Sequence, residues 1–165
     1  MTQDLIVSDA GPLIGLAIAG HVEILDALFE RILIPPTVLE ELQLEASRPG
    51  ALALSRAKDA GWLATAEVPE STEMTKLTEL LDRGEAEAIV LARSKNARLL
   101  IDENKGRVVA RSRGVAVIGT GGVLLLAKRQ KVIAEITPLL DDLASHGYRL
   151  SSALRRELLI LAGEV

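Results

Sequence analysis

The chain has 165 residues, which suits one domain that buries a core of its own without disulfide or metal staples. Apolar residues make up 48% of the sequence but aromatic residues only 2%, which predicts a core of Leu, Ile, Val and Ala and argues against stacking of nucleic-acid bases on aromatic side chains. The net charge is −4 at pH 7, and the absence of Cys excludes disulfides, thiolate zinc sites and cysteine nucleophiles.

The first part of the chain alternates short apolar runs with helical patterns. In chain order the predicted elements are a strand at 5–7, helices at 12–18 and 21–29, a strand at 32–34, helices at 37–42 and 46–61, and a strand at 62–66. Asp9 follows the first strand and is either a site residue at the end of that strand or the N-cap of the next helix. Glu40 and Glu41 are about 100° apart around their helix, so only one can point into a given cleft.

The second part of the chain is organised around residues 80–106. After a loop at 68–73, the predicted elements are a helix at 85–92, a strand at 98–101, a helix at 104–113, a strand at 115–118, a glycine-rich turn at 119–122, and helices at 123–129, 133–146 and 151–162. Glu85 opens the first of these helices, after Gly84 has ended the segment before it. Asp102 and Glu103 stand just past the strand at 98–101, with an N-cap role in the next helix as the alternative for Asp102. Helical spacing of four leucines predicts that the last helix docks on the core: Leu150, Leu154, Leu158 and Leu161.

Strands that alternate with helices favour an α/β fold, in which helices cover both faces of a parallel sheet. Ligands of such a sheet bind in the crevice beyond the carboxyl ends of the strands. Asp9 and Asp102 each follow a strand, and Glu41 and Glu85 lie in helices that can approach the same edge. Carboxylates of this kind suit Mg²⁺ or Mn²⁺, which generate hydroxide from water and offset the charge of a phosphodiester. Each acid taken alone has a structural role as its alternative.

The charges are distributed unevenly. Residues 93–131 hold ten Lys and Arg against two acids, in a chain whose net charge is −4. This block predicts a polyanion-facing surface next to Asp102, with solvated helix faces as the alternative. Lys105, Arg107 and Arg111 are the members expected to position a nucleic-acid backbone.

No membrane or targeting segment is predicted. The first residues lack a basic region, and the longest apolar run, residues 115–127, is well short of the roughly 20 residues that a spanning helix needs. We therefore expect a cytoplasmic protein with one domain over residues 1–165, on which helices within 133–165 pack.

Several motifs in the same order resemble those of the PIN (PilT N-terminus) domain nucleases. They are SDAGPLI at 8–14, IPPTVLEEL at 34–42, LDRGEAEAIVLA at 81–92, LLIDE at 99–103 and TGGVLLLAK at 120–128. The resemblance covers nearly the whole chain and is closest to a bacterial and archaeal subgroup of uncharacterised PIN-like proteins, near the toxins of virulence-associated toxin–antitoxin pairs. It implies a three-layer α/β/α sandwich with a mainly parallel central sheet, and a metal-dependent ribonuclease activity.

The resemblance also implies a set of site residues. By position in the motifs, the catalytic and metal-binding acids are Asp9, Glu41, Glu85 and Asp102, with Glu103 as a further metal ligand and Glu40 as the less favoured choice beside Glu41. Ser8 and Thr120 are expected to support the site. Two positions that are commonly Asp in the family are Glu here, Glu85 and Glu103, which predicts a weaker second metal site.

The leading hypothesis is a Mg²⁺- or Mn²⁺-dependent endoribonuclease, and the resemblance implies a homodimer and a cognate antitoxin protein as partners. A catalytically silent PIN-like module that binds RNA or protein through the same acidic pocket is the alternative. A phosphatase with an Asp nucleophile is the third hypothesis, weakened because Gly11 stands where many such enzymes have a second Asp.

Overall fold

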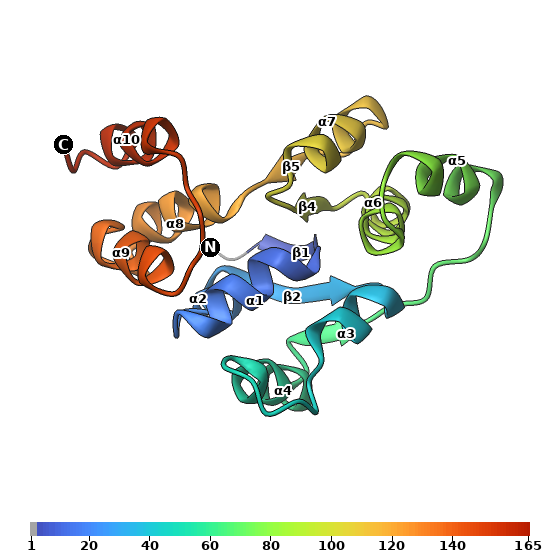
Figure 1. The fold of residues 1–165 in the computed structure, drawn as a ribbon, viewed down its shortest axis with the longest axis horizontal. Helices are drawn as coiled ribbons and strands as arrows, with labels where there is room; N and C mark the ends of the chain where they lie inside the picture. Colours follow the sequence, from blue (N-terminus) through green and yellow to red (C-terminus); the bar gives the residue numbers. More distant parts are fainter. Residues whose placement is uncertain (1–2) are drawn as a thin grey trace.

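The structure is a computed structural model that describes residues 3–165, so residues 1 and 2 of the predicted domain lie outside the described residues. Figure 1 shows the arrangement of its helices and strands. In chain order they are β1 (Gln3–Ser8), α1 (Ala10–Ile18), α2 (Glu23–Leu28), β2 (Phe29–Ile34), α3 (Pro36–Leu42), α4 (Ala51–Ala60), β3 (Leu63–Thr65), α5 (Thr72–Leu80), α6 (Arg83–Lys95), β4 (Arg98–Leu100), α7 (Asn104–Ser112), β5 (Val117–Ile118), α8 (Thr120–Arg129), α9 (Thr137–Ser145) and α10 (Ser152–Leu161).

The strands form one parallel sheet in the order β3-β2-β1-β4-β5, which confirms the predicted α/β fold. The central strand β1 pairs with β2 on one side, with Ile6 opposite Ile32, and with β4 on the other, with Ser8 opposite Leu100. The strand order therefore reverses between β1 and β4. Such a switch point leaves a crevice at the carboxyl ends of the two strands.

Each face of the sheet carries its own hydrophobic core, because successive strand side chains point to opposite faces. Ile6 belongs to a core with residues of α1, α2, α4, α8 and α9, whereas its neighbour Val7 belongs to a core with residues of α5, α6 and α7. All of the described strands except the short β5 place residues in one or both cores. The result is the predicted three-layer α/β/α sandwich, with its two helix layers visible on either side of the sheet in Figure 1.

The segment before the central helix differs from the prediction. Helix α5 had no counterpart among the predicted elements, although Ser71 caps it by accepting a hydrogen bond from the Met74 amide at 3.1 Å. Helix α6 begins at Arg83 rather than Glu85, so Gly84 lies inside the first turn and does not end a segment. The reason is Asp82, whose Oδ1 accepts a hydrogen bond from the Glu85 amide at 2.8 Å and caps the helix two residues earlier than predicted.

Three other predictions need correction. The glycine-rich turn at 119–122 is wrong from residue 120 on, since Thr120 already begins α8. Phe29 starts β2 and does not end a helix. In α10 only Leu158 is buried, against Gly121 of α8, whereas Leu154 and Leu161 are exposed. Leu150, just before the helix, packs against the core as predicted. Within residues 3–165, none of the helices is both long enough and apolar enough to span a membrane.

Candidate functional site

Two of the predicted acids lie where the strand order reverses. Asp9 follows β1, and Asp102 stands two residues past the end of β4. The Asp9 amide donates to the Leu100 carbonyl oxygen at 2.9 Å, which extends the pairing of the two strands to Asp9 itself. Both carboxylates therefore start from the same edge of the sheet, as their positions after neighbouring parallel strands require.

Asp9 is the N-cap residue of α1, as its alternative role predicted, but in the described part of the chain its side chain makes no hydrogen bond that caps the helix. The backbone of the turn is held instead by Ser8, which is fully buried and whose hydroxyl donates to the Asp9 carbonyl oxygen at 2.8 Å. The Asp9 carboxylate is left half-buried at the edge of the sheet.

Asp102 is held by donors from two distant segments. Its Oδ1 accepts from the Thr120 amide at 2.8 Å, and its Oδ2 accepts from the Thr120 hydroxyl at 2.6 Å and from the Tyr148 hydroxyl. The N-cap of α7 is Glu103, so the capping alternative for Asp102 is wrong for that helix. Asp102 binds Thr120 instead, which is the first residue of α8 and is 1% exposed.

Glu41 reaches the same edge from α3. A methyl group on Gly84 would collide with its Oε1 and would lie 3.6 Å from Oδ1 of Asp82, so the glycine provides the space in which these two side chains meet. Glu40 points elsewhere and lines a separate hollow of about 570 Å³ that also includes Lys58. Of the two neighbours, the structure therefore brings Glu41 to the acids at the sheet edge.

Glu85 is the most enclosed of the four acids, with 8% of its surface exposed. A methyl group on Gly106 would lie 2.5 Å from Oε2 of Glu85, so this glycine also makes room for a carboxylate. Among the described residues, Oε2 has no hydrogen-bond partner. A buried carboxylate oxygen without a partner is costly in its ionised form unless a cation or another donor binds it.

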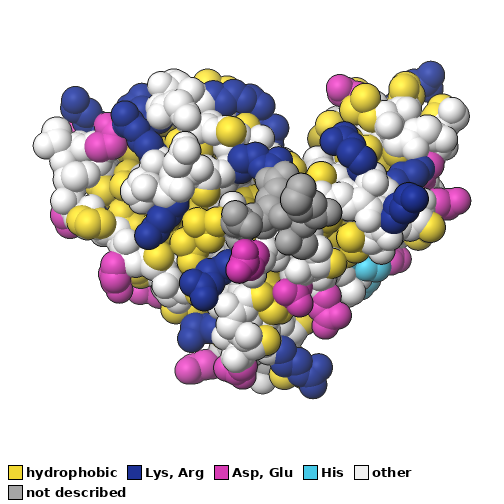
Figure 2. All heavy atoms as spheres, turned by 180° about the vertical axis from the view of Figure 1, so that it is seen from behind, with side chains coloured by type: hydrophobic (Ala, Val, Ile, Leu, Met, Phe, Trp, Pro, Cys, Tyr) yellow, Lys and Arg dark blue, Asp and Glu magenta, His cyan; other side chains and the backbone are white. Residues whose placement is uncertain are grey.

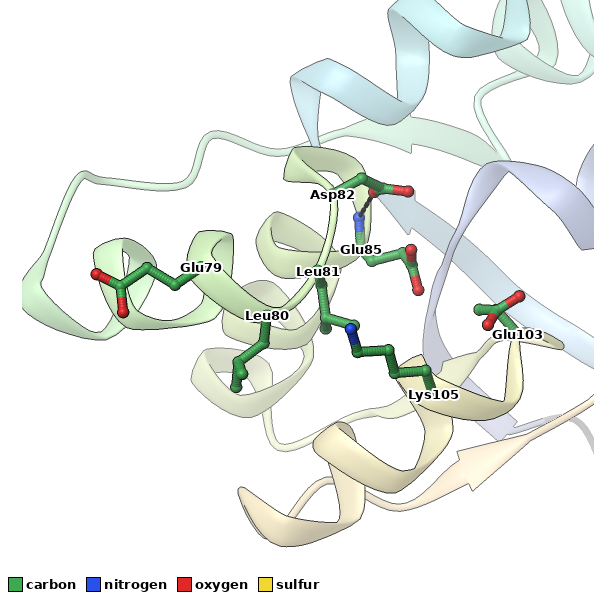
Figure 3. A pocket seen from close by; sticks show the side chains of 7 residues that line it. All are labelled: Glu79, Leu80, Leu81, Asp82, Glu85, Glu103 and Lys105. Carbon is green, nitrogen blue, oxygen red and sulfur yellow. Dashed lines mark hydrogen bonds between the residues drawn. The ribbon is translucent and has the colours of Figure 1, made fainter.

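The Glu85 carboxylate opens into a hollow of about 290 Å³ between α5, α6 and α7 (Figure 3). Its lining residues are Glu79, Leu80, Leu81, Asp82, Glu85, Glu103 and Lys105. Figure 3 shows Glu85 and Glu103 on one flank of the hollow and the Lys105 ammonium group turned toward Leu81. Glu103, predicted as a further metal ligand, is exposed at the rim.

Burial and mutual repulsion make these acids hard to ionise. Burial is the largest cause in each case, and it raises the pKa of Asp9 to about 6, of Glu41 to about 7 and of Glu85 to about 8. The charges of neighbouring carboxylates add to the effect: Asp82 acts on all three, and Asp9 acts on Glu41 and Glu85. A cation among them would reverse this preference, because it favours the ionised form of each carboxylate.

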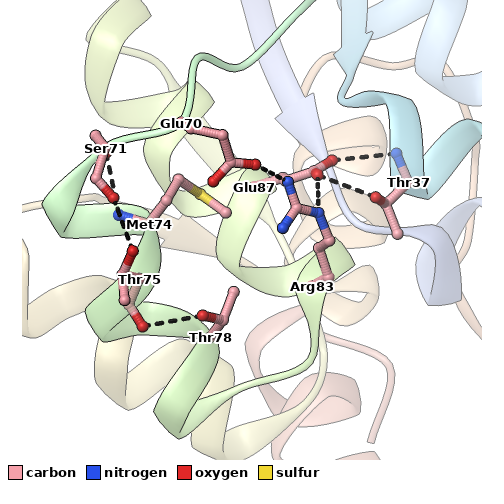
Figure 4. Close-up of polar contacts among 8 residues, drawn as sticks. All are labelled: Thr37, Glu70, Ser71, Met74, Thr75, Thr78, Arg83 and Glu87. Carbon is pink, nitrogen blue, oxygen red and sulfur yellow. Dashed lines mark hydrogen bonds and ion pairs between the residues drawn. The ribbon is translucent and has the colours of Figure 1, made fainter.

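Two acids near the site were not predicted. Asp82 lies at the rim of the hollow, and the signal for it was present in the sequence, since an acid three residues before Glu85 is typical of a helix cap. Glu87 is 5% exposed, and both of its carboxylate oxygens already have hydrogen-bond partners. It accepts hydrogen bonds from the amide of Thr37 at 3.1 Å and from the hydroxyl of Thr37 at 3.0 Å, and it forms an ion pair with Arg83 at 2.8 Å (Figure 4). Arg83 is shared with Glu70, so Glu87 acts in a network that ties α3 to α6.

The predicted nucleic-acid contacts occupy different environments. Lys105 and Arg111 are exposed on α7, whereas Arg107 is half-buried and donates to the Ile101 carbonyl oxygen at 2.9 Å, next to Asp102. Elsewhere in the basic block, Arg93 and Arg113 pair with Glu73, at 3.6 and 2.9 Å. In Figure 2, Lys and Arg side chains are numerous on the left lobe, which carries α5, α6 and α7.

The donor set fits a hard divalent cation. All of the candidate ligands are carboxylates, Glu85 contributes an unpartnered buried oxygen, and Gly84 and Gly106 leave room beside them. In residues 3–165 no three such side chains are already grouped closely enough to form a complete metal-binding cluster. Mg²⁺ does not require one, since it usually binds through one or two carboxylates and keeps several waters.

A family model described as PIN domain matches residues 5–164. Among solved structures, a PilT N-terminus domain protein from the hyperthermophilic archaeon Sulfolobus solfataricus P2 is similar, with 17% identity, a TM-score of 0.47, and coverage of 89% of this chain and 97% of that chain. A comparison with curated proteins gives no match.

Proposed function

The chain belongs to the PIN domain family, whose members are generally nucleases, and from that premise we propose that it is a metal-dependent endoribonuclease. The observation that carries the proposal is the convergence of Asp9, Glu41, Glu85 and Asp102 from four segments onto one edge of the sheet, with Oε2 of Glu85 left unpartnered within the described chain. Acids with raised pKa values in one crevice are typical of a functional site.

The acids and the residues that position them have different roles in the proposed reaction. Asp9, Glu41, Glu85 and Asp102 would hold Mg²⁺ or Mn²⁺, and Glu103 at the rim is the candidate for a second ion. A bound cation would supply an activated water and offset the charge of the phosphodiester. Thr120 fixes the Asp102 carboxylate through its amide and hydroxyl, and Ser8 fixes the turn that carries Asp9. The chain thereby provides oriented ligands before substrate binds.

The substrate is proposed to be RNA, held by basic side chains beside the acids. Lys105 lines the hollow that contains Glu85, and Arg111 is exposed on the same helix, so both are free to contact a phosphate backbone. Arg107 has a different role: its bond to the Ile101 carbonyl oxygen keeps a positive charge next to Asp102. A toxin of a toxin–antitoxin pair, blocked by a cognate antitoxin and acting as a homodimer, is the biological setting that we propose for this activity.

A catalytically silent module that binds RNA or protein is the second candidate. It is favoured by the hydrogen bonds that already engage both oxygens of Asp102 and by the lack of a complete three-ligand cluster in residues 3–165. Such a pocket would accept a basic side chain from a partner in place of a metal ion.

Calorimetry with Mn²⁺ and cleavage of pooled RNA, on the same samples, separate the two candidates. We expect the wild type to bind Mn²⁺ and to cleave RNA, and Asp102→Asn and Asp9→Asn to lose both while keeping the wild-type circular dichroism spectrum. Glu40→Gln is the matched control, because it removes a charge from the same helix as Glu41 but from a separate hollow. A folded wild type that neither binds Mn²⁺ nor cleaves RNA would leave the silent module as the function.

A further inference from the structure

Tyr148 is the only tyrosine of the chain, and it reaches the site from the segment between α9 and α10. Its backbone is fixed by α9, because its amide donates to the Leu143 carbonyl oxygen at 2.9 Å. Its ring lies against Gly15 of α1: a methyl group there would be 2.8 Å from Cδ2 of the ring. Tyr148 is thus held from two sides, and its hydroxyl is directed at Oδ2 of Asp102.

Among the described residues, the hydrogen bonds that Asp102 accepts leave one lone-pair site of its carboxylate unoccupied. A carboxylate offers about four lone-pair sites, two on each oxygen. Oδ2 accepts from the hydroxyls of Tyr148 and Thr120, which uses both of its sites. Within residues 3–165, Oδ1 accepts from the Thr120 amide alone. The remaining site is therefore on Oδ1. The tyrosine hydroxyl decides this, since without it Oδ2 would have an open site too.

We propose that Tyr148 is a positioning residue of the metal site: by occupying Oδ2 of Asp102, it makes Oδ1 the atom that meets the cation. The inference rests on the proposed function, because it needs a divalent cation at Asp102. The proposal assigns a function to the segment after α9, which the sequence had left without one.

The variant that tests this role is Tyr148→Phe, which removes the hydroxyl and keeps the ring that packs on Gly15. The matched control is Ser151→Ala, three residues on. It removes the side chain that accepts from the Leu154 amide and caps α10, so it loosens the same segment without touching Asp102. Mn²⁺ affinity is measured by calorimetry for both and for Asp102→Asn.

Loss of a hydrogen bond to a metal ligand typically weakens binding by about tenfold or more, and this is the loss expected for Tyr148→Phe. Ser151→Ala should change the affinity by less than a factor of about two. In the cleavage assay, kcat should fall while KM for RNA stays unchanged, because the hydroxyl contacts Asp102 rather than the substrate.

The two proposals can fail separately. If Tyr148→Phe binds Mn²⁺ as the wild type does, while Asp102→Asn does not bind it, the positioning role is overturned and the metal site stands. If Ser151→Ala loses as much affinity as Tyr148→Phe, the effect is one of segment stability and the positioning role is again overturned. If Tyr148→Phe alone weakens Mn²⁺ binding but the wild type cleaves no RNA, the positioning role stands and the nuclease function fails.

Discussion

Glutamine in place of Glu85 should flatten the dependence of folding stability on pH in the metal-free protein. Burial, followed by a hydrogen bond with the Asp82 side chain and then by the charges of Asp82 and Asp9, raises the pKa of Glu85 from 4.5 to about 8 in the folded chain. A group whose pKa rises on folding contributes its full stability below the unfolded pKa and loses it as pH rises through the folded pKa. The wild-type free energy of unfolding should therefore fall between about pH 4.5 and about pH 8.

The size of the effect follows from the same values. At about 1.4 kcal/mol per pKa unit, ionising Glu85 lowers the free energy of unfolding by about 3 kcal/mol between pH 5 and pH 8. Glu85→Gln should remove this part of the slope, because glutamine has nearly the same shape and no charge, and should leave the part that comes from the raised pKa values of Asp9 and Glu41. Urea unfolding at several pH values, in the presence of a chelator, measures it. Glu79→Gln is the control, since Glu79 lines the same hollow but is exposed and should leave the slope unchanged. If the free energy of unfolding of Glu85→Gln depends on pH as steeply as that of the wild type, the reasoning is refuted.

Three further predictions concern the C-terminal segment and the metal. Glu164→Gln should lower the free energy of unfolding by about 2 kcal/mol at pH 7 and by less at pH 3. Burial would raise the pKa of Glu164, but hydrogen bonds from Lys128 and Thr137 lower it to about 2. The contribution of Glu164 to folding stability is therefore lost as pH falls from about 4.5 toward 2. Thermal unfolding at pH 7 and at pH 3 checks this. Gly84→Ala should keep or raise the unfolding temperature, since Ala favours a helix over Gly by up to about 1 kcal/mol, yet weaken Mn²⁺ binding because the methyl group displaces Glu41. Wild-type affinity in that variant would contradict a role for Glu41. Saturating Mn²⁺ should raise the unfolding temperature of the wild type but not of Asp102→Asn, as scanning calorimetry will show.

The sheet was predictable because its strands carry strong local signals. Leu5, Ile6 and Val7 form an apolar run that ends in a turn, and the run at 98–101 ends in the same way. The sequence pattern places the start of α6 two residues too late, because a glycine such as Gly84 usually ends a helical segment. In the structure the capping side chain of Asp82 outweighs the cost of a glycine in the first turn. Helix α5 has only a sparse apolar pattern, with Met74 and Leu77 as its buried residues, which is too weak to identify from periodicity.

At the site, residues near strand ends could be predicted and their long-range partners could not. Asp9 and Asp102 follow strands, so the topology alone brings them to one edge. The choice of Glu41 over Glu40 depends on how α3 is rotated against α6, which is a matter of packing. Tyr148 is 46 residues from Asp102 along the chain and lies in a segment without a motif, so only the folded structure could reveal the contact.

The position of β1 at the centre of the sheet determines when the acids meet during synthesis. Its pairing with β2 involves residues that leave the ribosome early, whereas its pairing with β4, which brings Asp102 to Asp9, joins segments roughly ninety residues apart. The Tyr148 hydroxyl arrives later still. A nascent chain can thus build one half of the sheet while the carboxylates remain apart. For the proposed ribonuclease, this order delays the active arrangement until the segment that carries Tyr148 has been made.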